Sequence, residues 1–92
     1  MVQTEYMEYE KTYVDVAVNF LKEGGMRPLW VNWENGKRFT IERVKYIERA
    51  SARVGSVLPV RYTCMVAGKE KYLYFEPDSM RWFVEIPSNR HI

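Results

Sequence analysis

The chain has 92 residues, a formal net charge of +2, and a composition that is 47% hydrophobic and 15% aromatic. This length accommodates one domain with its own core, and the apolar content excludes an intrinsically disordered chain. The near-neutral charge argues against strong non-specific binding to nucleic acid or membranes, and no stretch approaches the ~20 apolar residues of a membrane span.

The pattern at the N-terminus changes near residue 13. Residues 1–12 have no clean hydrophobic period, and we expect a flexible or helical arm there. Tyr13 to Leu21 alternates apolar and polar side chains, which is typical of a half-buried strand. We therefore expect a single β domain over residues 13–86, followed by a disordered tail at residues 87–92.

The next two predicted strands are Met26–Trp33 and Arg38 to about Ala50. The Asn35-Gly36 pair between them favours a two-residue type I′ turn. The apolar side chains of the longer strand change parity near Glu42, which predicts a bulge and a bent strand. A bent long strand is what a small barrel requires.

The most informative stretch is RYTCMVAGKEKYLYFE, residues 61–76, which predicts a β-hairpin folded at Gly68-Lys69 through a type II′ turn. This register places Cys64 opposite Leu73 on an apolar face. The other face carries aromatic, hydroxyl and charged side chains. Arg81–Ile86 is the last predicted strand, and Trp82 and Trp30 are expected in the core.

These elements predict an all-β (mainly β) fold of about six strands. We expect an antiparallel meander in a strongly twisted sheet or a small, partly closed barrel. A helix would be short, either at the N-terminus or in residues 51–58.

The residues needed for catalysis are scarce. His91 is the one histidine and sits in the predicted tail, and Cys64, the one cysteine, falls on the apolar face of the hairpin. We therefore predict no enzyme, no catalytic residue, and no cofactor or metal site. The single cysteine and the lack of a basic, apolar leader after Met1 favour the cytoplasm and no membrane association.

One surface does stand out, because cationic and aromatic side chains recur on the outward positions of the middle strands. Small β-barrels use such surfaces to bind single-stranded nucleic acid. A solvated face whose charges protect a sheet edge is the other interpretation. The candidate partner or nucleic-acid surface comprises Trp33, Arg38, Arg43, Lys45, Arg49, Tyr72 and Tyr74.

The chain also resembles a known family. The pattern W-x-N-G-x-x-F-x-I at residues 33–41, the hairpin at residues 61–76 and RWFVE at residues 81–85 are similar to a family of small uncharacterised bacterial β-rich domains. The resemblance implies the fold and a bacterial cytoplasmic setting, and no activity. The layout is also faintly similar to small β domains associated with bacterial lesion-bypass polymerases, a fold-level analogy.

Two functions follow as hypotheses. The first is a small non-catalytic binding module that uses an exposed sheet face or edge, with a protein partner or a second copy of itself. The second is a single-stranded nucleic-acid-binding β-barrel that uses the basic and aromatic surface.

Overall fold

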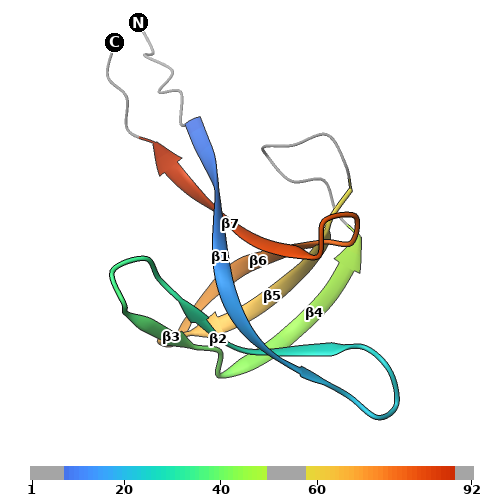
Figure 1. Ribbon diagram of the computed structural model, residues 1–92. Coiled ribbons are helices and arrows are strands. Elements are labelled where there is room, and N and C mark those ends of the chain that lie inside the picture. Colours follow the sequence, from blue (N-terminus) through green and yellow to red (C-terminus); the bar gives the residue numbers. More distant parts are fainter. Residues whose placement is uncertain (1–7, 50–57, 89–92) are drawn as a thin grey trace, which may run out of the picture.

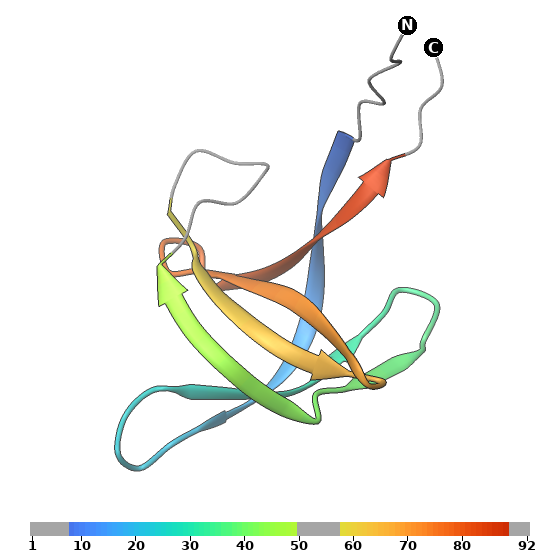
Figure 2. The same cartoon turned by 180° about the vertical axis from the view of Figure 1, so that it is seen from behind.

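A computed structural model describes residues 8–49 and 58–88, which form an all-β fold without a helix (Figure 1). Antiparallel strands make one seven-stranded sheet in the order β3-β2-β1-β7-β6-β5-β4. The strands are β1 (Glu8–Phe20), β2 (Met26–Asn32), β3 (Arg38–Thr40), β4 (Arg43–Arg49), β5 (Val60–Val66), β6 (Lys69–Glu76) and β7 (Arg81–Ser88). The sheet curls into a half barrel, as both views show (Figures 1 and 2). The predicted all-β, strongly twisted antiparallel fold is confirmed.

The extra strand arises because the predicted third strand breaks at Ile41 and Glu42. The Ile41 N–H donates to the carbonyl oxygen of Leu29 on β2 at 2.9 Å, and the Glu42 N–H donates to that of Met65 on β5 at 2.8 Å. The chain thus leaves one partner strand and joins another. The predicted bulge near Glu42 is therefore a corner between β3 and β4.

The predicted boundaries need correction at both ends. Residues 8–12, expected in an arm, belong to β1, because they pair with β7. Residues 87–88, expected in a disordered tail, belong to β7. The remaining parts of the arm and tail, residues 1–7 and 89–92, lie outside the described residues. So do residues 51–57, where a helix was an alternative.

The β5–β6 hairpin forms with a register two residues away from the predicted one. Ala67 and Gly68 make the turn, with φ values of 51° and 75°, which is the type I′ combination. Cys64 therefore lies opposite Lys71, and Tyr62 opposite Leu73. Because side chains alternate with a period of two, a two-residue shift leaves every side chain on its predicted face.

The register of the β2–β3 hairpin differs from the predicted register by a single residue. This shift, unlike that of the β5–β6 hairpin, changes the face on which side chains lie. The Trp33 N–H donates to the Lys37 carbonyl at 2.7 Å, so the loop has three residues and Gly36 sits at a φ of 83°. Trp30 then lies opposite Thr40. A one-residue slip moves side chains to the other face. Trp30, predicted in the core, is half-buried on the outer face instead.

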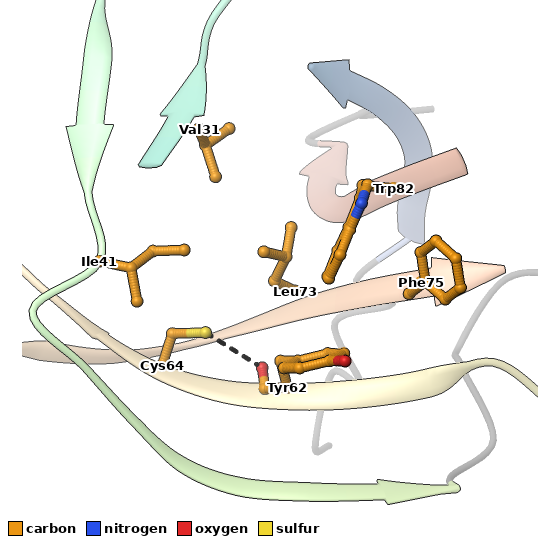
Figure 3. Close-up of a cluster of buried hydrophobic side chains, with 7 residues drawn as sticks. All are labelled: Val31, Ile41, Tyr62, Cys64, Leu73, Phe75 and Trp82. Carbon is orange, nitrogen blue, oxygen red and sulfur yellow. Dashed lines mark hydrogen bonds between the residues drawn. The ribbon is translucent and has the colours of Figure 1, made fainter. Parts of the chain in front are cut away.

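The core fills the concave face of the sheet (Figure 3). The indole of Trp82 lies 5.0 Å from the Tyr62 ring and 4.9 Å from the Phe75 ring, measured between centroids. The buried cluster comprises Val31, Ile41, Tyr62, Cys64, Leu73, Phe75 and Trp82. Trp82 and Cys64 are therefore core residues, as predicted.

Candidate functional site

A row of side chains crosses the outer, convex face of the sheet. Across β1, β7, β6, β5 and β4, the register aligns Tyr13, Phe83, Tyr74, Arg61 and Glu48. Phe83 stacks on Tyr74 with centroids 4.9 Å apart, and Tyr13 meets Phe83 edge-on at 6.1 Å. Arg61 Nη2 donates to Glu48 Oε1 at 2.7 Å. The row holds five strands together and leaves Tyr74 only 2% exposed.

One end of this row carries a charged network centred on Glu76. Its carboxylate accepts hydrogen bonds from Lys11 Nζ at 2.7 Å, from Ser79 Oγ at 2.7 Å and from the Tyr13 hydroxyl at 2.9 Å. The Lys11 hydrogen bond is the main reason that the pKa of Glu76 falls from 4.5 to about 2, and the same bond raises the pKa of Lys11. A carboxylate with this pKa and these partners is an ion-pair anchor and a poor general base at neutral pH.

The two predicted tyrosines differ in exposure. Tyr74 is buried, and burial together with its hydrogen bond to Glu85 raises its pKa to about 12. Tyr72 is partly exposed, but the guanidinium of Arg61 lies 4.5 Å from its ring centroid. A base stacking on Tyr72 would therefore have to displace this cation–π contact.

The aromatic residues of the β2–β3 hairpin are also engaged. The guanidinium carbon of Arg38 lies 4.2 Å from the ring centroid of Trp30, whereas the predicted partner was Trp33. Trp33 instead meets Phe39 edge-on at 6.4 Å. The one-residue change of register explains why Arg38 contacts Trp30 and not Trp33.

A register irregularity at Lys45 divides the three predicted basic residues of β4, because Arg43 and Lys45 lie towards the outer-face residues Met65 and Glu70 whereas Arg49 lies on the inner face. Lys45 Nζ lies 3.0 Å from Glu70 Oε1. Arg49 is aligned with the inner-face residue Val60, and its Nη1 donates to the Leu58 carbonyl at 3.1 Å. Arg43 is exposed. Four of the seven candidate residues, Arg43, Lys45, Tyr72 and Tyr74, thus share the outer face of β4 to β6, whereas Arg49 lies on the inner face and Trp33 and Arg38 lie on the β2–β3 hairpin.

A wedge between β2 and β4 is the feature that sequence reasoning missed. The two strands meet at the Ile41–Glu42 corner and then run apart (Figure 2). A groove of about 510 Å³ occupies this wedge. Its lining side chains are Leu21, Met26, Arg27, Arg43, Val44, Lys45, Tyr46 and Ile47.

A second groove, of about 540 Å³, is lined mainly by side chains of β1 and shares Met26 with the wedge. Phe20 and Met80 line it beside the core residue Trp82. Phe20 is 70% exposed, Met80 63% and Ile47 57%. We call the two grooves together the open side of the half barrel. Its exposed apolar side chains are grouped around the two grooves, whereas single scattered ones would need no explanation.

The alternation of β1 assigned Phe20 to the same face as Val16 and Val18. This assignment holds, since Phe20 is paired with Met26, which packs against the core cluster as both valines do. However, alternation identifies only the face, and the core ends before Phe20 is reached. The exposure of Phe20 follows from the curl of the sheet, for which the local sequence carries no signal.

The described residues contain no group of three or more His, Cys, Asp or Glu side chains that could hold a metal ion. Cys64 is buried, and burial raises the pKa of its thiol to about 11, which disfavours the nucleophilic thiolate. Among the same residues, no helix has the length and apolar character to cross a membrane.

Comparison of the chain with protein-family models, with curated proteins and with solved structures finds no match.

Proposed function

We propose that the chain is a small non-catalytic interaction module that holds a protein partner on the open side of the half barrel. The observation that carries this proposal is the exposure of Phe20, Ile47 and Met80 around the two adjoining grooves. Grouped exposed apolar side chains, in contrast to single scattered ones, mark interaction sites in soluble domains. A reducing cytoplasm is the proposed setting, supported by a free, buried Cys64.

The backbone near Met80 gives independent support. Met80 adopts a φ of 59°, a left-handed conformation that costs a non-glycine residue roughly 1–2 kcal/mol. The strain keeps a flexible thioether at the rim of a groove, where it is mostly exposed. Methionine adapts well to irregular partner surfaces, so a binding role accounts for both the strain and the residue type.

Site-specific photo-crosslinking tests the proposal. A photoreactive phenylalanine analogue is placed at Phe20 or Ile47, with Thr40 on β3 as the matched exposed control position. We expect a discrete protein adduct from positions 20 and 47 in the native cells and none from position 40. Equal adducts from all three positions, or none from any, would rule out a dedicated open-side site.

Single-stranded nucleic-acid binding is the second candidate, favoured by Arg43 and Lys45 beside the exposed ring of Tyr46. Phosphate contacts are strongest at low salt, so binding is expected by fluorescence titration at about 50 mM salt and should weaken steeply as salt increases. The absence of binding under that condition would eliminate this candidate.

A further inference from the structure

The wedge between β2 and β4 has a marked charge bias. Three cationic side chains line it, Arg27, Arg43 and Lys45, and no lining side chain is acidic. Within the described part of the chain, neither Arg27 nor Arg43 makes a salt bridge or side-chain hydrogen bond. Lys45 pairs with Glu70, but both side chains are partly exposed, so the pair can exchange for another carboxylate.

The floor of the wedge is aliphatic. Met26, Val44 and Ile47 line it, and Val44 and Met26 also pack against the core cluster. Tyr46 is its one aromatic residue. An aliphatic floor suits branched apolar side chains, whereas single-strand binders combine a basic groove with several aromatic platforms, of which the wedge has one.

The walls of the wedge are strand edges without a neighbouring strand. β4 is an outer strand of the sheet, and β2 pairs with β3 only from Trp30 to Asn32. The irregularity at Lys45 disturbs the first half of the β4 edge, but the second half, from Tyr46, is regular. Unpaired edges supply main-chain donors and acceptors to an extended segment.

From these features we infer that the wedge binds an extended, acidic segment of a protein partner. The apolar side chains of the bound segment lie on Ile47 and Met26, and the carboxylates of the segment meet Arg27 and Arg43. This inference rests on the proposed function and specifies the chemistry of the partner. A second copy of the chain fits poorly, because two β4 edges side by side would set Arg43 against its own copy when parallel and against Arg49 when antiparallel and centred on Tyr46.

A peptide titration of the full chain, followed by amide chemical shifts, tests the inference. The probe is a short synthetic peptide of alternating Glu and Val, which presents one acidic and one apolar face when extended. The comparison probe replaces each Glu with Gln. We expect the acidic peptide to shift the amides of Met26 and Ile47, and the Gln peptide to bind more weakly.

Charge-matched variants identify the residues responsible. The double substitution Arg27→Gln with Arg43→Gln should weaken binding of the acidic peptide at least about fivefold. The control, Lys37→Gln with Lys69→Gln, removes two charges outside the groove and should change the affinity less than about twofold. The absence of any shift with the acidic peptide would overturn the inference.

The other outcomes separate the inference from the proposed function. Equal binding of the two peptides, lost in Ile47→Ser, would overturn the acidic partner and leave an apolar open-side site standing. Tighter binding of an oligothymidine strand, lost in the double arginine variant, would assign the wedge to nucleic acid. Concentration-dependent shifts of the same amides without peptide would assign it to a second copy.

Discussion

Phe83 on β7 stacks face to face on Tyr74 of β6, with ring centroids 4.9 Å apart and ring planes 8° from parallel. The contact lies where the backbone pairing inside the sheet is short, because β6 and β7 pair only from Tyr74 to Glu76. The next residue pair along β6 and β7 lies on the opposite face. It consists of Phe75 and Trp82, whose ring centroids are 4.9 Å apart. Aromatic pairs on both faces thus join the two halves of the half barrel where backbone pairing is short.

Removing the Phe83 ring should therefore be costly. Phe83→Ala is expected to lower the free energy of unfolding by roughly 3–5 kcal/mol, and Phe83→Leu by roughly 1–2 kcal/mol, in urea titrations followed by circular dichroism. Tyr46→Ala, which removes an exposed ring from β4, should cost less than about 1 kcal/mol. Equal losses for Phe83→Leu and Tyr46→Ala would contradict the role assigned to this seam.

Acid should weaken the fold through Glu76. The pKa of Glu76 is about 2 in the folded state against an ordinary 4.5, mainly because Lys11 donates a hydrogen bond to its carboxylate. A depressed pKa means that the stabilisation is complete above about pH 4.5 and is lost as the pH falls towards 2. Urea unfolding at several pH values should show this slope.

Glu76→Gln should flatten the slope and also lower stability at neutral pH, because the amide cannot replace the ion pair with Lys11. Glu34→Gln, in the exposed β2–β3 loop, should leave the slope unchanged. The same slope in both variants would show that Glu76 is not the group responsible.

Sequence periodicity identified which side chains of the β5–β6 hairpin face the core. Tyr62 and Cys64 were placed correctly even though the β5–β6 register was shifted, because a two-residue shift preserves the face. The β2–β3 hairpin shows the limit. Asn35-Gly36 is compatible with a two-residue or a three-residue loop, and that one-residue difference moved Trp30 out of the core.

The candidate binding surface was less predictable for a related reason. The predicted basic and aromatic residues were assigned from local alternation, which the irregularity at Lys45 and the corner at Ile41 interrupt. The groove also depends on how far β2 and β4 diverge. That divergence is a property of long-range curvature, so neither Ile47 nor Arg27 carries a local signal of its position.

The thiol of Cys64 should be inert in the folded protein. It is 1% exposed, and burial raises its pKa to about 11, so little thiolate forms near neutral pH. Labelling with a thiol reagent at mild alkaline pH should rise with urea in step with loss of the β signal. Thr40→Cys in a Cys64→Ala background supplies the exposed control, which should label at once. Prompt labelling of Cys64 without denaturant would contradict its burial.

The β5–β6 turn contains an identifiable local strain. Ala67 has a φ of 51°, where glycine or asparagine is preferred in a type I′ turn. Ala67→Gly should therefore raise the free energy of unfolding by roughly 0.5–1 kcal/mol, measured in urea. Ala17→Gly in β1 is the matched control and should lower it by a similar amount, since an extended strand needs no positive φ. A loss of stability in Ala67→Gly would argue against the type I′ turn.

At position 80 we expect one substitution to raise the stability of the fold and to lower the binding of the partner. Asparagine tolerates the left-handed conformation better than methionine, so Met80→Asn is expected to raise the free energy of unfolding by up to about 1 kcal/mol. The same substitution removes an exposed apolar side chain from the rim of the open side, so crosslinking from position 20 should decrease. Urea unfolding and adduct yield are measured on one preparation. A gain in stability without loss of adduct would mean that the strain at Met80 serves no binding function, whereas a gain with loss would connect the strained turn to the partner site.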